Sequence, residues 1–111
     1  MATRPPIRVL IADDHRLFAE TLGLTLEADP RLEVVGYARD GREAVKLAIS
    51  LEPDVVLMDL DMPLVDGIEA ASAICRSLPA RVAILTASLL PEDALAGFPH
   101  DLLQFRARLA H

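Results

Sequence analysis

The stretch "VVLMDLDMP", residues 55–63, places two carboxylates, Asp59 and Asp61, one residue apart at the end of an apolar run. An ionised carboxylate at the edge of a core is costly unless a cation or several hydrogen bonds compensate its charge. The apolar run predicts a buried strand, so its acidic end indicates a functional site rather than packing. The rest of the chain must supply the compensating groups.

A second acidic pair, Asp13 and Asp14, directly follows the apolar run "IRVLIA", residues 7–12. In open α/β sheets, ligands bind outside the carboxyl ends of the strands. We therefore expect Asp13 and Asp14 to meet Asp59 in one pocket. The alternative for this pair is a helix N-cap, which would be the preferred interpretation if the pair stood alone.

The expected pocket suits a divalent metal ion. Three neighbouring carboxylates repel one another, and a hard cation is the usual remedy. Mg²⁺ prefers about six oxygen ligands at about 2.1 Å and keeps several waters, so two carboxylates and one backbone carbonyl would suffice. One oxygen of Asp59 could then attack a phosphoryl group whose charge the metal screens. The hydroxyl of Thr86, at the end of another apolar run, could hold a phosphoryl oxygen, or Thr86 is an ordinary strand residue.

The elements that must position these residues alternate along the chain. Continuous apolar runs are typical of parallel strands that are covered on both faces. Such runs predict strands over residues 7–12, 32–38, 54–59 and 81–87.

Helical patterns separate these predicted strands. The first follows residues 7–12 and ends at Asp29 and Pro30, and the second opens with a capping box formed by Asp40 and Glu43. The third follows the turn at Asp66 and Gly67. The apolar stripes that we expect to face the core are Phe18, Leu22 and Leu26; Ala44, Val45, Ala48 and Leu51; and Ile68, Ala71, Cys75 and Leu78.

Strand and helix alternation predicts βαβ units with right-handed crossovers, and hence an α/β, doubly wound parallel sheet. The chain has 111 residues, which fits a single domain over residues 1–111. Its 11 Lys and Arg against 17 Asp and Glu give a net charge of −6, which disfavours direct nucleic acid binding. With a single cysteine, no apolar run of about 18 residues and no signal-peptide core, we expect a cytoplasmic protein without membrane contact.

The segments "VLIADDH", "VVLMDLDMPLVDG" and "AILTAS" resemble the three motifs of the response-regulator receiver domain of bacterial two-component systems. The resemblance covers roughly residues 7–90, in order and with the family's spacing. It implies a flavodoxin-like fold with strand order 2-1-3-4. Whether a fifth strand follows depends on residues 98–111. The sequence around residues 13–45 looks most like receivers that precede a LuxR-type helix-turn-helix output domain, which implies transcription regulation. We expect no output domain within these 111 residues.

The resemblance also implies a role for each residue of the pocket. Asp59 would be the phosphoacceptor, Asp14 a direct Mg²⁺ ligand, and Asp13 a partner that acts through water. The backbone carbonyl of Asp61 would be the third protein ligand.

Two further roles follow from the same resemblance. Thr86 would be the switch hydroxyl, and Ala87 would be small enough to let the phosphoryl group approach. The phosphoryl group would come from a sensor histidine kinase or a small phosphodonor. Enzymatic activity would be limited to self-phosphorylation and self-dephosphorylation. We assign no role to His15, because a histidine in a first helical turn is more often solvated.

Residues 91–111 depart from the family pattern. Receivers carry a fifth strand with an aromatic residue and a lysine, whereas this chain has no lysine after Lys46. Family spacing would put Phe105 at the aromatic position and Arg108 at the lysine position. The apolar positions Phe98, Leu102, Phe105 and Leu109 instead favour a helix over residues 98–111.

A helical tail would leave the fourth strand as an unpaired edge with apolar surface beside it. We would then expect a homodimer formed through the strand-four side and the segment after Pro91. Two other functions remain open from the sequence. One is a degenerate receiver that acts as a phosphorylation-independent interaction or dimerisation module. The other, more remote, is a haloacid-dehalogenase-type phosphatase, because those enzymes also carry an Asp-x-Asp strand end.

Overall fold

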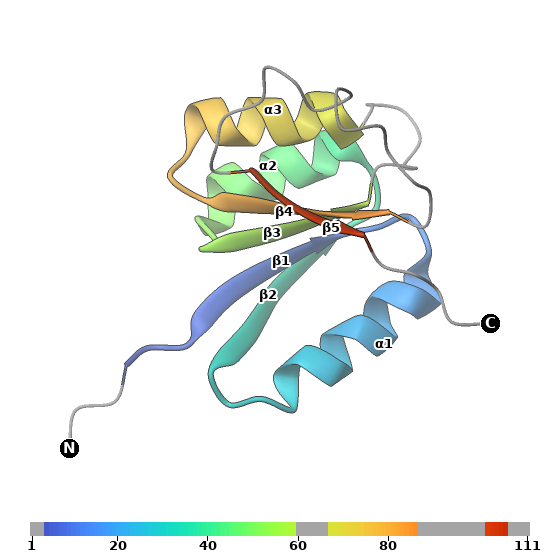
Figure 1. Ribbon diagram of the computed structural model, residues 1–111, viewed down its shortest axis with the longest axis vertical. Coiled ribbons are helices and arrows are strands. Elements are labelled where there is room, and N and C mark those ends of the chain that lie inside the picture. Colours follow the sequence, from blue (N-terminus) through green and yellow to red (C-terminus); the bar gives the residue numbers. More distant parts are fainter. Residues whose placement is uncertain (1–3, 60–66, 87–101, 107–111) are drawn as a thin grey trace.

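The computed structural model describes residues 4–59, 67–86 and 102–106, which form a parallel sheet with helices on both faces (Figure 1). The sheet has the strand order β2-β1-β3-β4-β5. Its strands are β1 (Ile7–Ala12), β2 (Leu32–Ala38), β3 (Val55–Asp59), β4 (Arg81–Thr86) and β5 (Leu102–Arg106). The helices are α1 (Arg16–Glu27), α2 (Gly41–Leu51) and α3 (Gly67–Ser77).

The predicted fold class is confirmed, with β1 and β2 at the predicted bounds. β3 begins one residue later than predicted, because Asp54 lies in the bend before the strand. β4 is described as far as Thr86, and the predicted last residue, Ala87, lies outside the described residues.

The helix predicted over residues 98–111 is wrong for the part that the structure describes. Leu102–Arg106 is a strand that pairs in parallel with β4, from Val82 opposite Leu102 to Thr86 opposite Arg106. Pairing with β4 satisfies backbone groups that an open edge would leave unpaired, and this outweighs the helical spacing of the apolar residues. The homodimer was predicted from an unpaired β4 edge, so that argument for it no longer holds.

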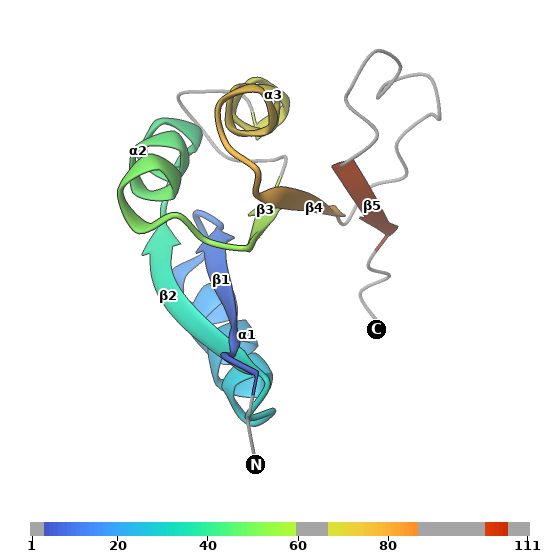
Figure 2. The same ribbon diagram turned by 90° about the vertical axis from the view of Figure 1, so that its left-hand side faces the viewer.

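The larger core lies between the sheet and the helices α2 and α3, which share one face of the sheet (Figure 2). Gly36 of β2 lets α2 approach closely, since a Cβ atom there would lie 2.9 Å from Leu51 Cδ1. The sheet contributes Leu10, Ala12, Ala38, Val56, Met58 and Val82, and the helices and the turn before β4 contribute Ala44, Ala48, Ala70, Ala71, Ile74 and Ala80.

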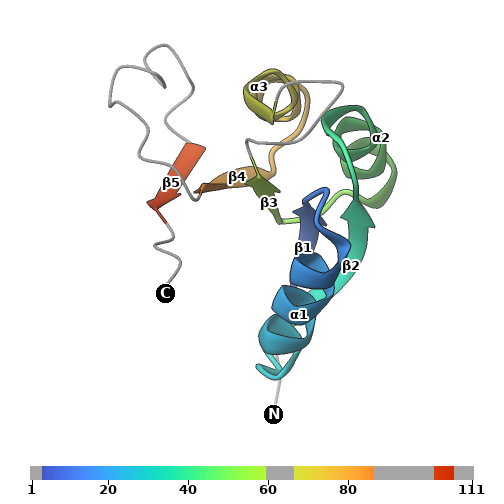
Figure 3. The same ribbon diagram turned by 90° about the vertical axis from the view of Figure 1, so that its right-hand side faces the viewer.

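The smaller core lies on the opposite face, where α1 packs against β1 and β2 (Figure 3). The predicted stripe is only partly right, because Leu22 and Leu26 pack there while Phe18 is 43% exposed. The fully buried residues of α1 are Ala19 and Gly23. A side chain at Gly23 would collide with Tyr37 of β2, so the small residues let the helix pack closely.

The predicted stripe of α3 is also shifted by about one residue. Ala70, Ala71 and Ile74 are fully buried, whereas Cys75 and Leu78 are half-buried and pack at the margin of the core. Small residues on the inner face allow α3 to lie close to α2 and to the sheet.

The N-terminus of α2 forms much as the sequence predicts. The carboxylate of Asp40 accepts a hydrogen bond of 2.8 Å from the backbone N–H of Glu43. The Glu43 side chain accepts from the backbone N–H of Arg39 at 2.9 Å, instead of from that of Asp40. The helix start is therefore capped by two side chains.

We predict that Asp40→Ala lowers the free energy of unfolding by about 1 kcal/mol, because it removes the N-cap acceptor. Asp40→Asn keeps an oxygen that can accept the same bond and is the matched control. Urea unfolding of both variants measures the difference. Equal losses in the two variants would show that the negative charge, rather than the capping bond, stabilises this helix.

Within the described ranges, no helix is long and apolar enough to span a membrane.

Candidate functional site

Three carboxylates and one imidazole converge at the carboxyl ends of β1 and β3. Each of Asp13, Asp14, His15 and Asp59 offers one ligand atom, and these four atoms lie within 4.8 Å of one another. The parallel pairing of β1 with β3, with Ala12 opposite Met58, brings the two strand ends side by side. The structure therefore brings together the three aspartates that the sequence predicts for one pocket.

Asp13 is the most enclosed member of the cluster, with 6% of its surface exposed. Its backbone N–H donates to the carbonyl of Ala38 at 2.9 Å, which extends the pairing of β1 with β2 by one residue. Its Oδ1 accepts from the backbone N–H of His15 at 2.8 Å. These two bonds hold the turn between β1 and α1, and they fix the position of the Asp13 carboxylate.

Asp14 and His15 form the outer side of the cluster. His15 Nδ1 lies 3.0 Å from Asp14 Oδ1 and 3.4 Å from Asp13 Oδ1. The negative charge of Asp14 raises the pKa of His15, helped by the hydrogen bond to Asp13 and the charges of Asp13 and Asp59. No role is predicted for His15 from the sequence, yet its 73% exposed ring lies beside both aspartates.

Asp59 ends β3 and is half-buried. In the pairing of β3 with β4, Asp59 lies opposite Leu85, so the backbone of Thr86 is the next position along β4. The described residues do not include Asp61 or Ala87, so their predicted roles stay predictions.

The donor set fits Mg²⁺. Carboxylate oxygens are the ligands that this ion prefers, and bonds of about 2.1 Å place opposite ligands about 4.2 Å apart. The observed spread of up to 4.8 Å needs only small side-chain movements to reach that geometry. A cation would also relieve the repulsion among the three carboxylates.

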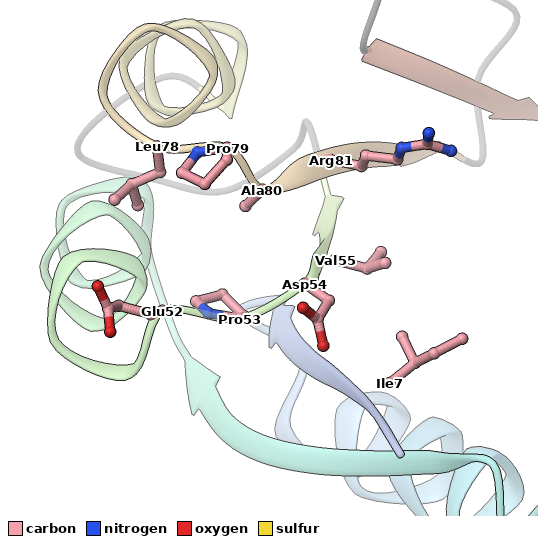
Figure 4. Close-up of a pocket in the computed structure, with 9 residues that line it drawn as sticks. All are labelled: Ile7, Glu52, Pro53, Asp54, Val55, Leu78, Pro79, Ala80 and Arg81. Atoms are coloured by element: carbon pink, nitrogen blue, oxygen red, sulfur yellow. The ribbon is translucent and has the colours of Figure 1, made fainter. Parts of the chain in front are cut away.

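A separate cleft of about 480 Å³ lies at the other end of the sheet (Figure 4). Its lining includes Ile7, Val55 and Arg81, which are the first residues of β1, β3 and β4. The cleft therefore opens at the amino ends of the strands and contains none of the predicted site residues.

A parallel sheet in this order, with an acidic cluster where β1 and β3 end, defines a doubly wound α/β protein of the flavodoxin-like class. The chain belongs to the response regulator receiver domain family, whose model matches residues 9–105. It is thus a receiver domain of two-component signalling. The family match favours this assignment over the haloacid-dehalogenase-type phosphatase that the sequence left open.

The chain is 49% identical to the transcriptional regulatory protein LiaR of Bacillus subtilis over 87 aligned residues. These residues make up 78% of this chain and 41% of LiaR. The chain therefore spans less than half the length of this relative.

Two solved structures show the same fold. The receiver domain of the putative response regulator NarL from Mycobacterium tuberculosis has a TM-score of 0.80 and 34% identity, over 93% of this chain and 84% of that one. A CheX-CheY-BeF3-Mg complex from Borrelia burgdorferi has a TM-score of 0.72 and 31% identity, over 82% of this chain and 69% of that one.

Proposed function

We propose that this receiver accepts a phosphoryl group on Asp59 with the help of Mg²⁺ and thereby switches a protein-interaction surface. The observation that carries the proposal is the convergence of Asp13, Asp14 and Asp59 within 4.8 Å at the carboxyl ends of two adjacent parallel strands. Membership of the receiver family supports the proposal, since the three aspartates of the pocket belong to the sequence motifs that resemble those of receivers.

In this proposal, Asp14, Asp59 and the backbone carbonyl of Asp61 would hold the ion directly, and Asp13 would act through water. Bound Mg²⁺ supplies positive charge that screens the oxygens of the incoming phosphoryl group. Asp13 is buried, its backbone N–H donates to the carbonyl of Ala38, and its carboxylate accepts from the backbone N–H of His15, so it would provide a fixed negative charge beside the nucleophile.

The chemical step transfers a phosphoryl group from an oxygen or nitrogen atom of the donor to a carboxylate oxygen of Asp59. One carboxylate oxygen of Asp59 forms a bond to phosphorus, while the bond from phosphorus to the donor's leaving atom breaks. Acetyl phosphate would release acetate, and a phosphohistidine donor would release its imidazole. Attack of water on phosphorus then returns the Asp59 carboxylate and inorganic phosphate. No other enzymatic activity is proposed for this chain.

Thr86 is proposed to hold one phosphoryl oxygen through its hydroxyl, and Ala87 to leave space for the group. The backbone register supports the place of Thr86, because it follows the residue that lies opposite Asp59. A sensor histidine kinase is the proposed donor in the cytoplasm, and the similarity to LiaR supports a transcriptional output.

The test is incubation of the protein with acetyl phosphate and Mg²⁺, followed by intact mass measurement. We expect one added phosphoryl group, and we expect EDTA to prevent its addition. A protein that takes up no phosphoryl group would instead be the phosphorylation-independent interaction module. This second function is favoured by one observation: the sequence has no lysine after Lys46, whereas receivers carry a lysine near the fifth strand.

The register of β5 suggests which arginine replaces the family's lysine. Spacing along the sequence selects Arg108, which lies outside the described residues, whereas the described strand ends at Arg106 with its backbone opposite Thr86. We predict that Arg106→Gln slows labelling by acetyl phosphate about tenfold or more, because it would remove the cation that we propose for the phosphoryl site.

Arg42→Gln, which removes an exposed cation from α2, is the control for the loss of charge. The labelling rate of each variant is followed by intact mass. A larger loss for Arg108→Gln than for Arg106→Gln would contradict the assignment from the register.

A further inference from the structure

His15 extends the acidic cluster with a nitrogen donor. Its Nδ1 lies 3.0 Å from Asp14 Oδ1 and 3.4 Å from Asp13 Oδ1, and its ligand atom is within 4.8 Å of that of Asp59. The backbone N–H of the same residue donates to Asp13 Oδ1, so the base of the side chain is held beside the carboxylates. The imidazole is 73% exposed and can turn without disturbing the core.

The cluster therefore contains two kinds of ligand with different metal preferences. Mg²⁺ prefers oxygen ligands alone and retains its waters, so an imidazole adds little to its binding. Zn²⁺ and the neighbouring transition metals bind imidazole nitrogen well, and mixed sets of histidine and carboxylate are common at their sites.

The observed distances match such a mixed site. Zn²⁺ bonds of about 2.0–2.2 Å to nitrogen and carboxylate oxygen place two ligand atoms of a tetrahedron about 3.4 Å apart. The separations of Nδ1 from the two carboxylate oxygens, 3.0 and 3.4 Å, lie close to this value. His15 Nδ1 and Asp14 Oδ1 can therefore bind one ion with little movement, and the ligand atom of Asp59, which lies within 4.8 Å of those of both residues, can reach the same ion after a side-chain shift.

We propose that His15 Nδ1 acts as a metal ligand together with Asp14 and Asp59, so that this site binds Zn²⁺-class ions in preference to Mg²⁺. The inference rests on the proposed function, because it uses the carboxylates assigned there to Mg²⁺. Since both ions need Asp14 and Asp59, Zn²⁺ competes with Mg²⁺ for the site.

The test compares the Zn²⁺ and Mg²⁺ affinities of the untagged full chain with those of His15→Gln, measured by calorimetry with a chelator as competitor for Zn²⁺. We expect the ratio of the Zn²⁺ to the Mg²⁺ affinity to fall about tenfold or more in the variant. His100→Gln and Cys75→Ser are matched controls, because they remove another histidine and the single cysteine of the chain and should leave the ratio unchanged.

A second readout follows the ligand atom directly. Two-bond ¹⁵N–¹H spectra of the histidine rings should show a large shift of His15 Nδ1 when Zn²⁺ saturates the protein, and no such shift with Mg²⁺. An unchanged affinity ratio in His15→Gln, or an unshifted Nδ1, would overturn the assignment.

Failure of this inference is distinguishable from failure of the proposed function. A wild-type protein that acetyl phosphate and Mg²⁺ do not label would refute the phosphoacceptor role, whereas an unchanged affinity ratio refutes only the role of His15.

Discussion

Asp59→Asn is expected to abolish labelling by acetyl phosphate. A carboxamide is a poor nucleophile, so the bond to phosphorus cannot form at this position. The substitution also removes one of the three negative charges that draw a divalent cation to the cluster. Intact mass measurement after incubation with acetyl phosphate and Mg²⁺ gives the result directly.

Asp54→Asn is the matched control for this experiment. Asp54 directly precedes β3, so the same chemical change is made beyond the opposite end of the same strand. Its Oδ2 accepts a hydrogen bond of 2.9 Å from the backbone N–H of Arg8, and an asparagine oxygen can accept that bond too. We expect Asp54→Asn to be labelled like the wild type. Labelling that persists in Asp59→Asn would place the acceptor on another residue.

Asp14→Ala is expected to weaken Mg²⁺ binding about tenfold or more and to slow labelling in proportion. The substitution removes a carboxylate that would bind the ion directly, and one charge of an electrostatically repulsive cluster. Because Asp14 is an exposed residue, its loss leaves no enclosed cavity. Calorimetric titration with Mg²⁺ and urea unfolding together measure the two effects.

Thermodynamic stability distinguishes a loss of metal binding from a loss of structure. Without Mg²⁺ we expect Asp14→Ala to be at least as stable as the wild type, because like charges no longer repel at that position. Glu33→Ala removes an equal charge from an exposed position in β2 and is the control for net charge. Unfolding of Asp14→Ala, or an equal loss of Mg²⁺ affinity in Glu33→Ala, would contradict the metal-ligand role.

The sequence by itself determined the order of elements up to β4. Buried parallel strands need apolar residues on both faces, so "IRVLIA" and "RVAILTA" are visible as continuous runs without any knowledge of their neighbours. The acidic cluster was predictable for a related reason. Once the sheet is parallel, the ends of β1 and β3 must meet at one edge, and the residues that follow them must share a pocket.

Packing within each helix was predicted less accurately, because periodicity locates an apolar stripe only to within one residue. Phe18 belongs to a good helical stripe but is 43% exposed, since α1 turns its small residues toward the sheet. The reason lies in β2, where Tyr37 occupies the space beside Gly23. No pattern within α1 alone carries that information.

Only the tertiary structure decided the state of residues 102–106 and the surroundings of His15. Leu102 and Phe105 have a spacing compatible with a helix, yet β4 offers a row of backbone groups that a fifth strand satisfies. The His15 ring lies against Asp13 and Asp14 because the backbone N–H of His15 donates to Asp13 Oδ1 and thereby holds the turn after β1. The fifth strand depends on β4, which is distant in sequence, and the place of the His15 ring depends on the direction of the turn after β1. Local periodicity encodes neither.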